Sequence, residues 1–251
     1  MSSAERVLDL LGAVSRRPRG ASLTEISQEL DIPAPSVHRL LRICVDRGFC
    51  DQDPRSQHYL PGPRLIDLSR ATLEGHDVVS AALPELRQLR DRTGETTFLT
   101  TLVGQSATCI AVEASGRPMR LHIQLGLRMP YHASAAARAI LAFRHPDEAK
   151  RLLGNEELVP YTEATPTTID AALAPLERVR TDGFASSHNE LDENTLGLAA
   201  PIRDRHGQVD ASICVALPLS RFPLDEQDQV AELILRAAER VSASLGSRTT
   251  T

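Results

Sequence analysis

The chain has 251 residues, of which 41% are hydrophobic and 24% are charged, and its net charge is −5. This is enough apolar material for one large domain or two ordinary ones with buried cores, which excludes a small disulfide-stapled fold. The charge excludes both a disordered acidic tail and a protein that coats nucleic acid. Because only 3% of the residues are aromatic and none is Trp, a platform that stacks single-stranded bases is not expected.

Compartment and cofactors follow from the cysteines and the first residues. Cys44, Cys50, Cys109 and Cys214 lie in apolar stretches and lack the CxxC spacing of a structural zinc site. We therefore expect free, buried thiols in a reducing compartment, with no metal and no cofactor. The opening MSSAERVLDLLGAV lacks the long apolar run of a signal peptide, and no run of eighteen apolar residues occurs. These features predict a cytoplasmic protein that does not enter a membrane.

The first 48 residues show helical periodicity in three runs. Apolar residues recur on one face over residues 7–14, 23–30 and 37–45. Ser22 and Glu25 have the spacing of a capping box at the start of the second run. Pro33 follows the second run closely and is well suited to open a helix. The pattern predicts three short helices, the last two joined by a tight turn.

After Gly48 the period changes from helical spacing to two. Residues 49–52 and 57–60 flank Asp53-Pro54-Arg55-Ser56, which is a type I turn signal, so a small hairpin is expected. Three helices and a hairpin in this order are typical of a winged helix-turn-helix. We predict that domain over residues 1–63, a linker helix over 64–75 and a second domain over 76–251.

The second domain alternates strands and helices. Helices are expected at 83–92, beginning near Pro84, and at 134–143, 147–153, 169–181 and 225–246. Strands are expected at 96–103, 107–114, 119–125, 184–187, 196–202 and 209–217. A mixture of this kind predicts an α+β fold around one sheet.

Several segments in one register resemble a known family. Leu23 to Ile26, Ile32-Pro33, Ser36 to Leu41, Arg47 to Phe49 and Tyr59 to Arg64 resemble the DNA-binding domain of the IclR family of bacterial transcriptional regulators. Leu86 to Thr96, Pro130 to Ala135, Gly183 to Ala185 and Leu198 to Pro201 resemble its effector-binding domain. The resemblance implies a GAF-like effector domain with a central antiparallel sheet, a homodimer or homotetramer on a palindromic operator, and regulation of a catabolic operon by a small metabolite.

The third predicted helix carries the DNA-binding residues that we expect. Its polar side, opposite the core stripe, and the hairpin tip together present Ser36, His38, Arg39, Arg42 and Arg55. Arg39 or Arg42 can pair with guanine, Ser36 with a phosphate or base edge, and Arg55 with phosphate or the minor groove. The alternative is a solvated helix face without a partner. Arg16, Arg17 and Arg19 suit either the DNA backbone or a charged solvent loop.

The chain departs from the family pattern at three places. Ala34 and Pro35 stand where members commonly have a Lys and a hydroxyl residue, which alters the expected phosphate contacts. Asn194 and Gly197 stand where a Gly and a Cys are usual, and Ser187-His188 replaces an acidic pair.

Transferring the family's effector pocket residue by residue gives eight positions. These are Pro118, Leu121, Ala135, Ala136, Ser187, Gly197, Cys214 and Ala216. Several are smaller or less polar than in relatives that bind short keto acids, so we expect a roomier, more apolar pocket suited to an aromatic acid. The helix start around residues 133–137 leaves amides open to a carboxylate, although these alanines also suit close packing on a sheet.

Two other classes of function were weighed. His132 with Ser134, or Cys214 with His188, resembles a base and nucleophile pair, but the chain has no GxSxG, HExxH, P-loop or dinucleotide motif. We therefore expect no enzyme and no catalytic residue, and structural roles for His132 and His188 rather than ligand contacts. A sensor that acts only through protein partners is the other alternative. DNA binding by the N-terminal domain alone distinguishes it.

Overall fold

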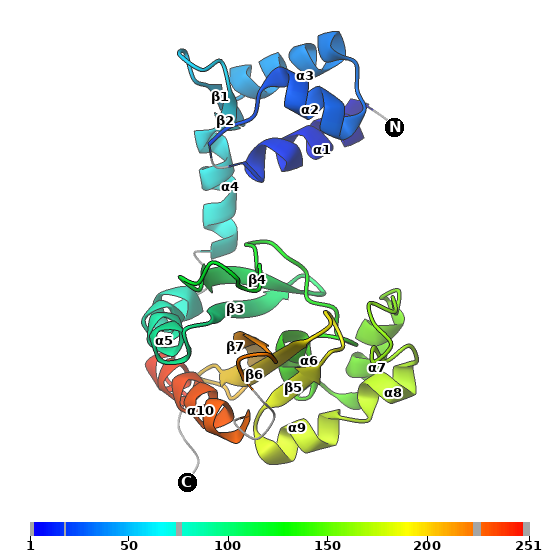
Figure 1. Cartoon of the computed structure of the whole chain (residues 1–251), viewed down its shortest axis with the longest axis vertical. Coiled ribbons are helices and arrows are strands. Elements are labelled where there is room, and N and C mark those ends of the chain that lie inside the picture. Colours follow the sequence, from blue (N-terminus) through cyan, green and yellow to red (C-terminus); the bar gives the residue numbers. More distant parts are fainter. Residues whose placement is uncertain (1–2, 18, 74–76, 223–226, 248–251) are drawn as a thin grey trace. The chain divides into compact units, whose positions relative to one another are not determined.

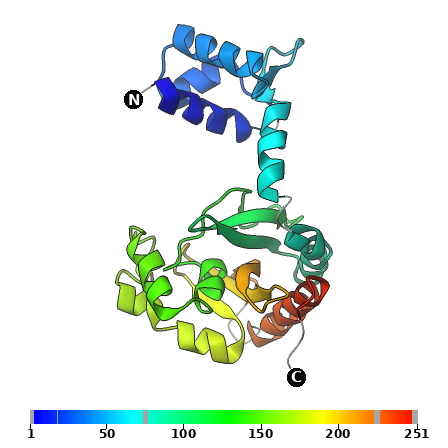
Figure 2. The ribbon, with the colours of Figure 1, turned by 180° about the vertical axis from the view of Figure 1, so that it is seen from behind.

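The computed structural model describes residues 3–17, 19–73, 77–222 and 227–247. The chain forms two compact units, Met1–His76 and Asp77–Thr251, each with its own hydrophobic core (Figure 1; Figure 2 shows the reverse side). Helices and strands are mixed, which confirms the predicted α+β class.

The first unit is a winged helix-turn-helix. Its elements are α1 (Ser3–Ser15), α2 (Leu23–Leu30), α3 (Ala34–Asp46), β1 (Cys50–Gln52), β2 (Tyr59–Pro61) and α4 (Pro63–Leu73). The three predicted apolar stripes meet the hairpin in one core, which includes Leu10, Ile26, Val37, Leu41 and Tyr59. The predicted linker helix corresponds to α4, and residues 74 and 75 lie outside the described residues.

Local chemistry sets the angle between α2 and α3. Asp31 ends α2 in the left-handed region at φ 51°, and the Ser27 hydroxyl donates to the carbonyl of buried Ile32 at 2.6 Å. At the start of α2, Ser22 accepts from the Glu25 amide, and the Glu25 carboxylate accepts from the Ser22 amide at 2.7 Å. These hydrogen bonds from Ser22 hold the pKa of the Glu25 carboxyl below its usual value. The predicted capping box is confirmed.

The hairpin is attached to the helices through backbone contacts. Ala21, just before α2, exchanges two backbone hydrogen bonds with Tyr59 on β2, at 2.8 and 3.0 Å. Gly62 follows β2 where a Cβ atom would lie 2.3 Å from the Gly48 carbonyl oxygen. Only glycine allows this close approach, so the chain can return past the end of α3 and begin α4.

The second unit is built on one antiparallel sheet. Its helices are α5 (Asp77–Thr93), α6 (Ala135–Leu141), α7 (Pro146–Gly154), α8 (Ile169–Leu173), α9 (Leu176–Asp182) and α10 (Gln227–Ser244). Its strands are β3 (Thr96–Val103), β4 (Ser106–Glu113), β5 (Ala185–His188), β6 (Thr195–Arg203) and β7 (Val209–Pro218), ordered β4-β3-β7-β6-β5. All pairs are antiparallel, as the family resemblance implied.

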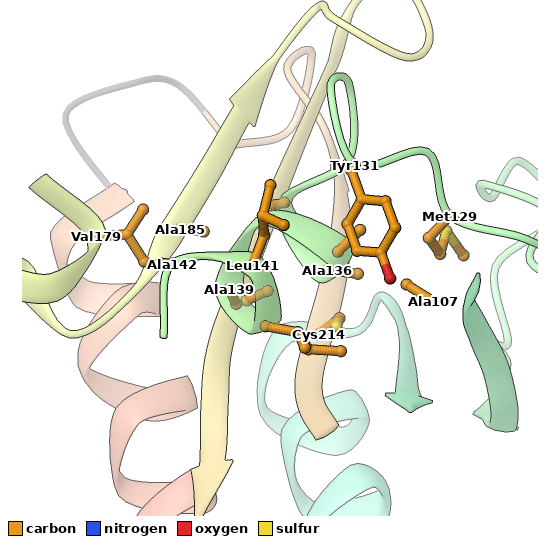
Figure 3. Packing of buried hydrophobic residues seen from close by; sticks show 14 of the residues in the cluster. Ala107, Met129, Tyr131, Ala136, Ala139, Leu141, Ala142, Val179, Ala185 and Cys214 are labelled. Carbon is orange, nitrogen blue, oxygen red and sulfur yellow. The ribbon is translucent and has the colours of Figure 1, made fainter. Parts of the chain in front are cut away.

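The two faces of the sheet are covered differently. Helices α5 and α10 lie side by side on one face, over Ile213, Val215 and Leu217 of β7 (Figures 1 and 2). On the other face, Cys214 and Ala216 of β7 meet the alanines of α6 (Figure 3). Because the side chains on this second face are small, α6 packs very close to the strands.

The predicted strand at 119–125 is wrong. Met119 and Leu125 are 69% and 68% exposed, and no strand forms there. The chain reaches the free edge of β4 only later, where Gly126 (φ 81°) and Leu127 pair with Cys109 and Met129 pairs with Ala107. The alternation of apolar residues predicted a strand over residues 119–125. The backbone there instead bonds to side chains and loops, as at the Met119 and Leu121 carbonyls, and not to a neighbouring strand.

Two predicted helices also differ from the structure, and the start of a third is not tested. Helix α5 begins at Asp77 and contains Pro84, since burial of Val78 and Ala82 offsets the lost hydrogen bond. The helix predicted over 169–181 is split into α8 and α9 at Pro175, which has no amide hydrogen to continue it. The last helix is described from Gln227, and residues 225 and 226 lie outside the described residues.

Replacing Ser22 with Ala tests the capping box. The loss of this cap should destabilise α2 by about 1 kcal/mol. Hydrogen exchange of the full chain, followed by mass spectrometry, should then be about fivefold faster over residues 23–30. Thr24→Ala, at an exposed position two residues further on, is the matched control and should not speed exchange. Equal protection in the wild type and Ser22→Ala would contradict the stabilising role of the cap.

Candidate functional site

The outer face of α3 presents the polar residues singled out from the sequence. Val37, Leu40, Leu41 and Cys44 are buried against the core of the first unit. On the opposite side His38, Arg39 and Arg42 are exposed and Ser36 is half-buried. Ile43 is 48% exposed on the same side, which is unusual for a large apolar side chain without a contact to make.

The arginines of the first unit fall into two groups. Arg16 and Arg17 both form ion pairs with Glu29 on α2, with 2.6 Å between Arg17 Nη1 and Glu29 Oε2. Within the part of the chain that the structure describes, Arg39 and Arg42 form no ion pair. Among the described residues, the arginines on the outer face of α3 therefore have no carboxylate partner, whereas Arg16 and Arg17 share the carboxylate of Glu29.

The hairpin tip is a rigid turn. Asp53 Oδ1 accepts from the amides of Arg55 and Ser56 at 2.8 and 2.7 Å, which also holds the pKa of the Asp53 carboxyl below its usual value. Gln57 closes the turn in the left-handed region at φ 58°. The Arg55 side chain is exposed at this tip. Ser36, His38, Arg39 and Arg42 thus share one helix face, and Arg55 stands on the neighbouring hairpin.

A cavity of about 80 Å³ lies in the second unit between α6 and the sheet. Seven of the eight predicted effector residues line it: Leu121, Ala135, Ala136, Ser187, Gly197, Cys214 and Ala216. Pro118 does not. It is exposed, on a stretch whose neighbours Arg117 and Met119 are held by Glu95 and Arg221 rather than by the cavity wall.

The cavity has apolar walls and a few hydroxyl groups. Phe98, Leu121 and Met129 form much of the apolar surface, together with the small side chains of α6 and β7. The Ser187 hydroxyl donates to the Ala133 carbonyl at 2.6 Å, and Ser134 makes no side-chain bond to the start of α6. Apart from the Cys214 thiol, the ionisable side chains of the lining are His122 and Asp192, and both are exposed.

Sequence reasoning missed part of this lining. Phe98 shares a face of β3 with Thr96 and Thr100, so strand alternation alone could have placed it toward α6. Met129 and Leu191 come from connections between elements, where no periodicity signals direction, and Thr195 is the first residue of β6.

The alanine run packs on the sheet, and two of its residues also line the cavity. Ala133, Ala137 and Ala139 are fully buried, and the Ser212 hydroxyl on β7 donates to the Ala136 carbonyl at 2.8 Å, so the run packs closely on the sheet. Ala135 and Ala136 also line the cavity. Because α6 has only seven residues, its dipole is too short to carry anion binding by itself.

The residue pairs considered for catalysis lack the chemistry for it. His132 is fully buried, stacks on Tyr161 with ring centroids 5.7 Å apart, and has Nε2 3.1 Å from the Val159 carbonyl oxygen. Burial raises the pKa of the Cys214 thiol to about 12, so this sulfur is protonated at neutral pH and is a poor nucleophile.

Comparison with known proteins assigns both units. Residues 3–54 match the IclR helix-turn-helix domain, and residues 70–243 match the C-terminal domain of bacterial transcriptional regulators of the IclR type. The chain belongs to the IclR family of bacterial transcriptional regulators. It is therefore similar throughout to DNA-binding proteins with a C-terminal effector domain.

Relatives in other bacteria match over nearly their whole length. The transcriptional regulator KdgR of Escherichia coli is 29% identical, covering 98% of this chain and 93% of KdgR. The regulator BhcR of Paracoccus denitrificans is 30% identical, covering 97% of this chain and 87% of BhcR. The crystal structure of Thermotoga maritima IclR has the same fold, with a TM-score of 0.79 at 23% identity over 97% of this chain and 98% of that one.

In this IclR-family chain, two further structural findings concern metal binding and membrane crossing. Among the described residues, no three His, Cys, Asp or Glu side chains come close enough together to hold a metal ion. No described helix is both long and apolar enough to cross a membrane.

A buried ion pair fixes one wall of the cavity under α6. Arg138, on the inner side of α6, is 2% exposed and forms an ion pair with Glu190, with 3.1 Å between Nη1 and Oε1. The same guanidinium donates to the carbonyls of Ser186 and His132. Because Glu190 lies in the loop between β5 and β6, the pair anchors the loop that brings Leu191 to the cavity.

Another ion pair anchors the segment that covers the cavity, residues 117–128. Glu95 is fully buried and accepts two hydrogen bonds from Arg221, at 2.7 and 2.9 Å. Arg221 also donates to the Met119 carbonyl at 3.2 Å, and the Thr96 hydroxyl donates to the Leu121 carbonyl at 3.1 Å. The cover segment is tied to the sheet through these side chains and, at residues 126–128, by backbone pairing with β4, and its Leu121 and Ile123 form part of the cavity wall.

Glu190→Gln tests the buried pair. Removing the carboxylate charge leaves the Arg138 guanidinium buried without its counter-ion, which should cost about 3 kcal/mol. For a unit of this size the melting temperature should fall by roughly 6 to 12 °C in a thermal unfolding scan. Glu232→Gln removes the carboxylate of an exposed pair with Arg236 and should change stability by less than about 0.5 kcal/mol. Equal losses of stability in the two variants would contradict the stabilising role of the Arg138–Glu190 pair.

Proposed function

We propose that this protein regulates a catabolic operon by binding duplex DNA through α3 and the β1–β2 hairpin, in response to a small carboxylic acid held under α6. The DNA-binding surface is inferred from the two exposed arginines on α3. No carboxylate among the described residues neutralises them. A phosphate-rich duplex supplies the missing negative charge.

Each side chain has a distinct role in this proposal. The first turns of α3 enter the major groove, where Arg39 and Arg42 donate to guanine O6 and N7. Ser36 and His38 bind a phosphate or base edge beside them. Arg55, held out by the Asp53 turn, contacts phosphate or the minor groove.

A single copy offers few cations for a duplex. Non-specific affinity rises with the number of phosphates that the protein neutralises, so a monomer with these residues would bind weakly. We infer a homodimer or homotetramer in the cytoplasm that places two α3 helices on a palindromic operator, about one helical turn apart. Effector binding then shifts the population between arrangements that fit and do not fit the operator.

Footprinting tests the DNA-binding surface. The full chain is incubated with the DNA upstream of its own gene and neighbouring genes, at stated salt concentrations. Arg39→Ala should abolish the specific footprint, and Arg55→Ala should lower the slope of log affinity against log salt by about 1. Arg178→Ala, which removes an exposed arginine of the second unit, is the charge-matched control. An unchanged footprint with Arg39→Ala would remove this residue from operator recognition.

For the effector we propose an aromatic monocarboxylic acid. The apolar wall of Phe98, Leu121 and Met129 suits a ring, and the sulfurs of Met129 and Cys214 favour ring contacts. The Ser134 and Thr195 hydroxyls suit one carboxylate. The cavity of about 80 Å³ is smaller than the ~150 Å³ that admits benzene in an engineered apolar site, so the cover segment moves outward on binding.

Thermal-shift titration of the full chain tests the effector class. Benzoate and 4-hydroxybenzoate should raise the melting temperature more than glyoxylate and pyruvate at equal ionic strength, because only a ring fills the apolar wall. Gly197→Val should abolish the shift, since a side chain there starts 3.4 Å from Ala135 Cβ and fills the cavity. Gly154→Val lies outside the cavity and should respond like the wild type. Larger shifts from the keto acids would overturn the aromatic class, and a full response of Gly197→Val would place the ligand elsewhere.

A further inference from the structure

A second hollow in the effector unit, of about 660 Å³, shares no residue with the cavity under α6. It lies between the end of β6, the β6–β7 turn, the end of α9 and α10. Its volume falls in the range of small-molecule sites. Gly183, which ends α9, approaches Leu235 of α10 so closely that a Cβ atom would lie 3.2 Å from it, and these two elements close one side.

The lining of this hollow is basic, although the unit that contains it is acidic. Residues 74–251 have 18 basic and 24 acidic side chains. The hollow is nevertheless lined by Arg180 of α9, Arg203 of β6 and Arg205 of the β6–β7 turn, with Glu239 as the one carboxylate among the residues that the structure assigns to it. Three arginines from three separate elements thus line one hollow.

Two of these guanidinium groups have no acidic partner among the described residues. Arg203 lies over the ring of Phe143, 4.5 Å from its centroid, and donates weakly to the Gly207 carbonyl. Arg205 donates through Nε to His206. The nearby Asp204 carboxylate accepts from the backbone amides of His206 and Gln208, so it stabilises the β6–β7 turn. Arg180, by contrast, is already paired with Glu177 at 2.6 Å.

We propose that this hollow binds a small dianion, either a phosphate ester or a dicarboxylate, between Arg203 and Arg205. A guanidinium donates two parallel hydrogen bonds to such an anion, and two unpaired guanidiniums match two negative charges. Phe143, Pro201 and Leu235 provide an apolar floor for the body of the ligand, and Glu239 accepts from its hydroxyl groups. The concave shape selects a small molecule over a flat macromolecular surface.

Isothermal titration calorimetry of the full chain tests this site. The titrants are inorganic phosphate, glucose 6-phosphate and succinate, at an ionic strength kept constant with chloride. Arg205→Ala, at an exposed position, and Arg203→Ala should each weaken binding at least tenfold, with the folded state checked by circular dichroism. Calorimetry is preferred to a thermal shift because phosphate stabilises folded proteins generally through exclusion from their surface.

Two control variants separate this site from other basic surfaces. Arg236→Ala removes an arginine of α10 that does not line the hollow. The double variant Arg39→Ala with Arg42→Ala removes the two positive charges of the α3 arginines. Both should bind the titrants as the wild type does. Tighter binding of glucose 6-phosphate identifies a phosphate ester, and tighter binding of succinate a dicarboxylate. Loss of binding in either control, unchanged binding in Arg205→Ala and Arg203→Ala, or no binding by the wild type would overturn the proposal.

Discussion

The close contact between α6 and the sheet is the constraint on which the second unit depends. The strands present Gly197, Ala199, Cys214 and Ala216 toward α6, and the helix presents alanines in return. Small side chains on both sides let the backbones approach until the Ser212 hydroxyl reaches the Ala136 carbonyl. The cavity lies where this contact ends, next to Gly197, which has no side chain to fill the space. Packing and binding are therefore set by the same residues.

Charged pairs in buried positions determine how that cavity is enclosed. Arg138 and Glu190 hold the loop after β5, and Glu95 and Arg221 hold the cover segment. A buried pair contributes little net stability but is costly to break, so it favours one loop arrangement over others. Residues 126–128 of the cover segment pair with β4, whereas the carbonyls of Met119 and Leu121 accept from the side chains of Arg221 and Thr96.

The sequence predicted most of the fold because local signals and burial agree. In the first unit the capping box at Ser22, the Pro33 turn and three apolar stripes all point to the same three helices. The errors occur where tertiary contacts override a local signal. Burial of Val78 carries α5 past Pro84, and Leu121 has the alternation of a strand but lies in a loop. Seven cavity residues followed from the family resemblance, whereas Met129 and Leu191 had no periodic signal.

The sequence by itself determined the order of the elements, the face of each helix and strand that is buried, and the family of the chain. The order and the buried faces depend on the spacing of apolar residues along a short stretch, and the family on motifs that resemble it in one register, so both are written in the chain directly. Only the tertiary structure decided that Arg16 and Arg17 share a carboxylate while Arg39 and Arg42 have none among the described residues, and that Arg203 and Arg205 share one hollow. The charge that a side chain meets depends on groups brought to it by folding, and no local pattern records them.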